Sequence, residues 1–144
     1  MKRLSVKEAE YIAFKLAQEF LSSNEQVPDF SIRYPSILEN CLTAPFQDFG
    51  VKSSCRGIIG KAAALFYLLI KNHPFHSSNK RVAVTALLVF LFKNKKWLKA
   101  DTQELYNFTM WIVDSPPRFK IETVKAIEKF IRLHLARGEG SLWR

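Results

Sequence analysis

Two long apolar segments separated by a short polar loop constrain the fold of this chain more than any other feature. Residues 58–70 and 82–92 are almost entirely apolar. A helix that is hydrophobic on every face belongs in a protein core, and neither segment reaches the roughly 20 residues that a membrane span requires. Loop 71–78 joins them. The sequence therefore predicts an antiparallel pair of helices at the centre of the molecule, with Asn94 and nearby lysines ending the second.

Shorter signals predict further helices and one hairpin. Ser5 followed by Glu8 is a capping box that opens a helix ending near residue 21. Segment 44–54 alternates loosely between apolar and polar residues and carries one Gly, which favours a short exposed β-hairpin. Other helices are predicted for residues 35–42 (starting with Pro35), 101–113 (capped by Asp101) and 118–137 (after Pro116 and Pro117).

These elements predict an all-α fold, a helical bundle around the central apolar pair with one small β-hairpin. Domains average roughly 100–200 residues. The 144 residues are therefore expected to form a single domain, 1–144.

The charge of the chain is uneven. The net charge is +9, with 22 Lys and Arg against 13 Asp and Glu. Such a balance suits a partner that carries phosphates or acidic patches, while the absence of helix-turn-helix spacing makes nucleic acid a less favoured partner. A basic run forms either a solvated surface or an anion site, and both interpretations remain open. Between residues 49 and 100 there is no Asp or Glu, and the basic residues there are Lys52, Arg56, Lys61, Lys71, Lys80, Arg81, Lys93, Lys95, Lys96 and Lys99.

Cysteine use and the N-terminus favour a cytoplasmic protein. Cys41 and Cys55 are too few for a disulfide framework, and no Cys/His zinc spacing is present. Free thiols are typical of a reducing compartment. The first residues return to charge before an apolar stretch forms, so no secretory signal is predicted. We expect no association with a membrane.

A polar loop leads directly into the N-terminus of the second apolar helix. The free backbone N–H groups and positive dipole of a helix N-terminus attract anions. Asn79 can serve as N-cap, and the small residues Ser77 and Ser78 leave room for a phosphate. Lys80 and Arg81 fall in the first turn, where the helix dipole disfavours cations. The pattern therefore indicates a bound anion.

His73 lies beside this anion site in the sequence. Histidine exchanges protons near physiological pH, so it suits the removal of a proton from an attacking hydroxyl. A loop histidine with only structural hydrogen bonds is an equally good interpretation of the spacing alone. Phe75 is most simply a core anchor. His73 and His76 have no carboxylate beside them, which makes a metal-binding pair the weakest interpretation.

The string HPFHSSNKR at residues 73–81 resembles the motif HPFx(D/E)GN(G/K)R of the Fic/Doc (Fido) family. Its context is similar as well, because an apolar helix precedes the motif and another follows it. The ending Asn-Lys-Arg and the small chain resemble the Doc (death-on-curing) branch. Residues 44–50 resemble the segment that precedes or forms the family's flap. The resemblance spans about residues 36–97 and implies a Fido-type helical bundle.

The resemblance also implies roles for single residues. His73 would be the general base that acts on a target hydroxyl, and Phe75 would pin the loop into the core. The flap would hold a target peptide as an added strand and would comprise Phe46, Gln47, Asp48, Phe49 and Gly50. Nucleotide phosphates would be bound by Ser77, Ser78, Asn79, Lys80 and Arg81.

The residue before the motif arginine indicates the reaction. Arg81 would pair with nucleotide phosphates, a task suited to guanidinium. Lys80 stands where AMP-transferring members have Gly. In Doc proteins this change accompanies transfer of the terminal phosphoryl group of ATP to a protein hydroxyl, in that case on elongation factor Tu. The resemblance thus implies a toxin with ATP as co-substrate, a translation factor as protein substrate and an antitoxin as partner.

One departure from the motif bears on catalysis. The family's acidic residue, which helps to hold Mg²⁺, is Ser77 here, and a hydroxyl is a much poorer ligand for magnesium. Only a more distant carboxylate, such as Asp48 or Asp101, could replace it. Val84 occupies the place of a second motif arginine that Doc proteins also lack. A catalytically impaired binding module and an AMP transferase therefore remain as alternatives.

Overall fold

The structure is a computed structural model and describes residues 1–21, 32, 34–47, 57–75 and 79–137. Within these ranges the chain is almost entirely helical, so the predicted all-α fold is confirmed. The helices are α1 (Val6–Leu21), α2 (Pro35–Thr43), α3 (Gly57–Asn72), α4 (Asn79–Lys93), α5 (Thr102–Asp114) and α6 (Lys120–His134), with short 3₁₀ turns η1 (Ala44–Phe46) and η2 (Pro117–Phe119) and strands β1 (Lys96–Leu98) and β2 (Leu135–Arg137).

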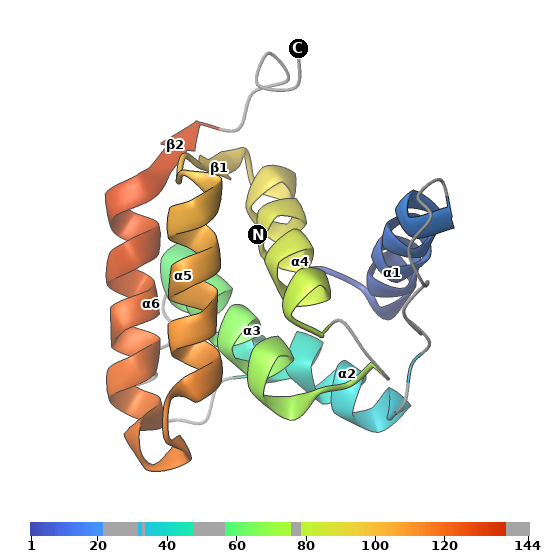
Figure 1. The fold of residues 1–144 in the computed structure, drawn as a ribbon, viewed down its shortest axis with the longest axis horizontal. Helices are drawn as coiled ribbons and strands as arrows, with labels where there is room; N and C mark the ends of the chain where they lie inside the picture. Colours follow the sequence, from blue (N-terminus) through green and yellow to red (C-terminus); the bar gives the residue numbers. More distant parts are fainter. Residues whose placement is uncertain (22–31, 33, 48–56, 76–78, 138–144) are drawn as a thin grey trace.

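The two apolar segments form the centre of the bundle. Helix α3 packs against α2, α4, α5 and α6, while α1 packs against α4 on the other side. Figure 1 shows α4 between α1 and the upright pair formed by α5 and α6. Ala62 and Ala63 of α3 and Ala83 and Ala86 of α4 are fully buried, and such small side chains allow two helices to approach closely. The prediction of two buried helices is confirmed, and each is extended at its ends by polar residues.

Local capping signals explain where the outer helices begin. The Ser5 amide donates to Glu8 Oε1 at 2.9 Å and the Glu8 amide donates to Ser5 Oγ at 3.1 Å, which confirms the capping box of α1. Asp101 Oδ2 accepts a bond of 3.4 Å from the Glu104 amide and caps α5. Pro35 is the first residue of α2.

The observed sheet corrects the predicted last helix. Residues 118–137 were expected to be helical throughout, but α6 ends at His134 and residues Leu135–Arg137 form β2. This strand pairs antiparallel with β1, with Leu98 opposite Leu135, and the Lys99 amide donates to the His134 carbonyl at 2.8 Å. Backbone pairing with a segment distant in sequence therefore replaces the last helical turn.

The expected hairpin at 44–54 is wrong over its first residues. Residues Ala44–Phe46 form a 3₁₀ turn that continues directly from α2. Phe46 packs edge-on against Phe90 of α4, with ring centroids 5.8 Å apart, and the Arg3 guanidinium lies 4.4 Å from its ring centroid. Contact with the core therefore removes Phe46 from an exposed flap. Gln47 follows in extended conformation, and residues 48–54 lie outside the described residues.

The helices in the described part of the chain are each too short or too polar to cross a bilayer.

Candidate functional site

The sequence motif lies at the junction between α3 and α4. Helix α3 ends at Asn72, and His73 adopts a φ of 48°, in the left-handed region that side chains other than Gly rarely occupy. Pro74 follows and cannot continue a helix. The chain therefore turns sharply at His73, whose side chain is exposed to solvent.

A reciprocal pair of hydrogen bonds holds the loop after His73. The Phe75 amide donates to Asn79 Oδ1 at 2.9 Å, and Asn79 Nδ2 donates to the Phe75 carbonyl at 3.0 Å. Phe75 is 1% exposed and belongs to the core cluster, and Asn79 is also buried. These bonds join the two ends of segment 76–78, which itself lies outside the described residues.

The role of the Asn79 side chain differs from a simple helix cap. The sequence pattern predicted that its oxygen would accept from an amide further along the helix, as an N-cap does. In the structure the amide group bonds backward to Phe75 in both directions. It therefore holds the shape of the loop.

Other contacts anchor the junction on the α2 side. The Tyr34 amide donates to the Pro74 carbonyl at 3.2 Å, and Ile32 forms an isolated antiparallel bridge with Phe75. Asn72 Nδ2 lies 3.8 Å from the Cys41 sulfur. Burial raises the pKa of the Cys41 thiol to about 11, so this cysteine remains a protonated, structural residue.

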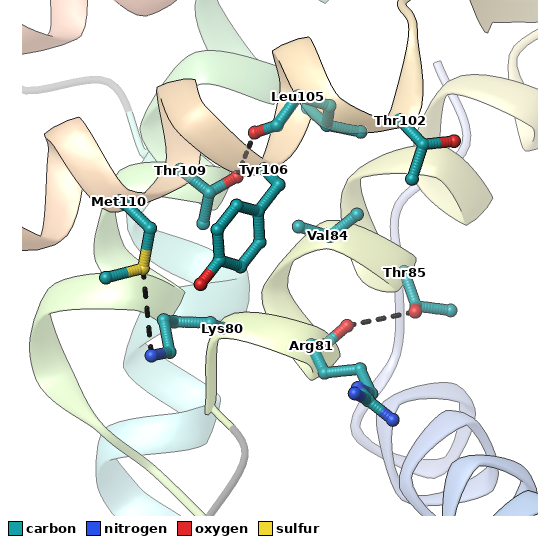
Figure 2. A pocket seen from close by; sticks show the side chains of 9 residues that line it. All are labelled: Lys80, Arg81, Val84, Thr85, Thr102, Leu105, Tyr106, Thr109 and Met110. Carbon is teal, nitrogen blue, oxygen red and sulfur yellow. Dashed lines mark hydrogen bonds between the residues drawn. The ribbon is translucent and has the colours of Figure 1, made fainter.

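Lys80 and Arg81 present their charges at the first turn of α4. Both side chains are exposed. Figure 2 shows them diverging, with Lys80 directed toward α5 and Arg81 directed to the opposite side. Lys80 Nζ lies 3.8 Å from Met110 Sδ, and in the described part of the chain no carboxylate forms an ion pair with it. A lysine without a counter-ion at the positive end of a helix favours a bound anion.

A cavity of about 440 Å³ opens beside this turn, between α4 and α5. The Thr85 and Thr109 hydroxyls donate to carbonyls of their own helices at 2.9 and 2.8 Å, so the cavity walls are chiefly apolar (Figure 2). An apolar wall with an aromatic ring beside cationic side chains suits a ligand that has a flat apolar part and an anionic part. The lining residues are Lys80, Arg81, Val84, Thr85, Thr102, Leu105, Tyr106, Thr109 and Met110.

The α5 wall of this cavity was not anticipated from the sequence. Leu105, Tyr106, Thr109 and Met110 lie 24 to 30 residues beyond Lys80 and Arg81 and carry no motif. The only sequence signal at α5 is its cap at Asp101, which predicts a helix and not its neighbours.

The described residues of the turn supply no carboxylate for Mg²⁺. Asp101 was one of two carboxylates that could replace the missing motif acid, and its side chain caps α5. The other, Asp48, and the substituted position, Ser77, lie outside the described residues. Within the described ranges, no three His, Cys, Asp or Glu side chains gather as a metal-binding group.

Comparison with known proteins agrees with the geometry. The model of the Fic/DOC family matches residues 5–91, which is more than half of the chain and includes α2, α3, the junction and most of α4. The chain belongs to the Fic/DOC family. No curated protein matches its sequence. The match to the Fic/DOC family ends within α4, so the α5 wall of the cavity lies beyond the matched residues.

Proposed function

We propose that this member of the Fic/DOC family is a Doc-like toxin that transfers the terminal phosphoryl group of ATP to a hydroxyl of a protein target. The target class is a cytoplasmic translation factor of the elongation factor Tu type, and an antitoxin is the expected partner. The observation that carries the proposal is the junction itself. His73 follows α3, the two cations lie in the first turn of α4 after one short loop, and an apolar cavity opens beside that turn.

The cavity and the first turn suit the two parts of ATP. The phosphates are assigned to the N-terminus of α4, where the helix dipole favours an anion and Lys80 and Arg81 offset its charge. Ser77 and Ser78 complete the loop around them in this proposal. The base is placed in the cavity against the exposed ring of Tyr106.

The proposed chemistry uses His73 as a general base. The imidazole takes the proton of the target hydroxyl as its oxygen attacks the γ-phosphorus. A bond forms between that oxygen and phosphorus, the bond from phosphorus to the bridging β–γ oxygen breaks, and ADP leaves. Amides and cations at the turn stabilise the charge on the phosphoryl oxygens. The described residues of the turn supply no carboxylate for Mg²⁺, so the proposed roles are those of this chain's own residues.

The target peptide is assigned to the segment after α2. Phe46 packs against Phe90, so contact with the peptide falls to Gln47, Asp48, Phe49 and Gly50. Added-strand binding draws on main-chain hydrogen bonds, which require an accessible extended backbone.

A binding module without catalysis is the second candidate, and Ser77 is the observation that favours it. A hydroxyl in place of the motif acid leaves the phosphate site without its carboxylate. If this candidate holds, Ser77→Asp creates or sharply raises nucleotide-dependent activity.

Labelling with ATP tests the proposal. Purified protein is incubated with elongation factor Tu and ATP labelled on either the γ or the α phosphate, with and without Mg²⁺. We expect γ label on the target with the wild type and none with His73→Ala. His134→Gln is the control, because His134 lies on α6 outside the cavity lining. Equal label with His73→Ala overturns the general base, and α label on the target identifies AMP transfer. Binding of ATP without label supports the binding module.

A further inference from the structure

Lys71, in the last turn of α3, connects that helix to the end of α5. Its Nζ donates to the carbonyl oxygens of Ile112 at 3.2 Å, Val113 at 3.1 Å and Ser115 at 2.6 Å. These carbonyls lie at the C-terminus of α5, where backbone oxygens have no amide one full turn further along the helix, and the Ile112 carbonyl also accepts from the Ser115 amide at 3.1 Å. The tie therefore spans two elements that are about 40 residues apart in sequence.

The Lys71 ammonium uses all of its hydrogen-bond donors in this tie. An ammonium group has three N–H donors, and each finds one carbonyl here. The negative end of the α5 dipole also attracts the positive charge. Ser115 Oγ donates to the Ile112 carbonyl at 2.6 Å and closes the same end of the helix. Lys71 is partly buried, so removal of its charge leaves carbonyls that water reaches only in part.

The tie lies where it determines the shape of the cavity. Helices α4 and α5 both pack against α3, and the cavity lies between them. The placement of α5 relative to α4 therefore depends on how each is held to α3. Lys71 stands two residues before His73, so the same turn of chain fixes α5 and begins the motif loop.

We propose that Lys71 is a positioning residue of the candidate site. It holds α5 so that Tyr106 and Met110 face Lys80 across the cavity, and it thereby sets the affinity for the nucleotide. It acts through the α5 wall and touches no reacting atom. The inference rests on the proposed function, because it assigns the cavity to ATP.

Lys93 supplies a matched control. It lies in the last turn of α4, as Lys71 does in α3, and its ammonium pairs with Glu8 of α1. It too ties one helix to another, and like Lys71 it does not line the cavity, but its tie does not involve the α5 wall. Lys93→Met therefore removes a comparable tie away from the site.

The experiment compares Lys71→Met, Lys71→Arg and Lys93→Met. The readouts are thermal unfolding, the Kd of a fluorescent ATP analogue, and amide hydrogen exchange of residues 105–110. Because displacement of the α5 wall lowers the affinity for the nucleotide steeply, we expect Lys71→Met to raise the Kd about 10-fold. Lys71→Arg restores affinity to within about 2-fold, because guanidinium also donates to carbonyls. Lys93→Met lowers the unfolding temperature and leaves the Kd unchanged.

An equal loss of unfolding temperature in both Met variants with no change in Kd overturns the inference. A wild type that binds no nucleotide instead overturns the proposed function, and hydrogen exchange then decides on the role of Lys71 alone. Faster exchange at residues 105–110 in Lys71→Met but not in Lys93→Met supports the positioning role. Unchanged exchange contradicts it.

Discussion

The two ends of the central helices share an unusual backbone geometry and use it differently. His73, directly after α3, has a φ of 48°, and Lys95, two residues after the end of α4, has a φ of 62°. These are the non-glycine residues with positive φ in the described part of the chain. Glycine is the usual residue at such a position after a helix. Both junctions therefore retain a strained residue where glycine would be easier to accommodate.

At the second junction, neighbouring groups close the helix and the Lys95 side chain is not needed. The Asn94 and Lys95 amides donate to the Leu91 and Phe92 carbonyls, both at 3.0 Å. The Asn94 side chain also bonds to both backbone groups of Lys2, at 2.7 and 2.8 Å. The Lys95 side chain is exposed. The left-handed backbone at Lys95 therefore helps to end the helix, and its side chain takes no part in the bonds that close it.

At the first junction the left-handed residue is His73, the proposed general base. It is exposed at the turn, and the bonds between Asn79 and Phe75 hold the loop that follows it. Strained backbone often persists where the surrounding structure fixes it and function requires it. Under the proposed function, histidine follows α3 because of its imidazole and in spite of the backbone conformation.

His73→Gly removes the imidazole and also relieves the left-handed backbone, and it has the largest expected effect on activity. Loss of a general base reduces transfer by about 10²- to 10⁴-fold, while relief of the left-handed strain raises the free energy of unfolding by about 0.5–1 kcal/mol. Phosphoryl transfer and urea unfolding measure the two quantities on one sample. A variant that is both more stable and fully active contradicts the comparison.

Asn79→Ala tests how the first junction is held. It leaves the buried amide and carbonyl of Phe75 without partners, and we expect a loss of about 2–4 kcal/mol in unfolding free energy. Asn94→Ala is the matched control at the second junction. Its two bonds to Lys2 are exposed and exchange to water, and only its bond of 2.9 Å to the Phe90 carbonyl is partly buried, so the expected loss is about 0.5–1.5 kcal/mol. Equal losses in urea unfolding would show that the two junctions are held alike.

Lys95→Gly relieves strain where no function is expected. The gain in unfolding free energy should be about 0.5–1 kcal/mol, with phosphoryl transfer unchanged. His73→Gly and Lys95→Gly should therefore stabilise the fold to a similar degree, but only His73→Gly should lower phosphoryl transfer. A fall in activity with Lys95→Gly would extend the functional site to the second junction.

The pH dependence of stability reports on the end of α4. Partial burial raises the pKa of the Glu8 carboxyl, but hydrogen bonds from Lys93 and Ser5 outweigh it and hold the pKa below its usual range. A lowered pKa stabilises the fold above the unfolded value, 4.5, and this contribution is lost as pH falls through the folded pKa. Glu8 is well exposed, so solvent screening limits the effect to about 0.5 kcal/mol. Wild type should therefore exceed Glu8→Gln in stability at pH 7 and match it near pH 3. A constant difference contradicts the pairing with Lys93.

Local signals in the sequence predicted the parts of the fold that depend on neighbouring residues. The bond pair of Ser5 and Glu8 and the Asp101 cap are examples, since their partners are three residues away. Uninterrupted apolar runs likewise predicted the buried pair α3 and α4.

Features that depend on distant residues could not be predicted in this way. Leu135 lies in a strand and not in the expected helix, because it pairs with Leu98. Phe46 lies in a 3₁₀ turn and not in the expected hairpin, because it packs against Phe90 in the core. The α5 wall and the Lys71 tie join segments about 25 to 45 residues apart, for which a single sequence holds no periodic signal.

The binding of nucleotide phosphates at the first turn of α4, beside His73 in the sequence, underlies both proposals. A crystal structure with a non-hydrolysable ATP analogue is its most direct test. We expect phosphate oxygens within hydrogen-bonding distance of the first-turn amides of α4, with the base in the cavity against Tyr106 and the imidazole facing the terminal phosphate. A nucleotide bound elsewhere, or an imidazole turned away from the phosphates, contradicts it.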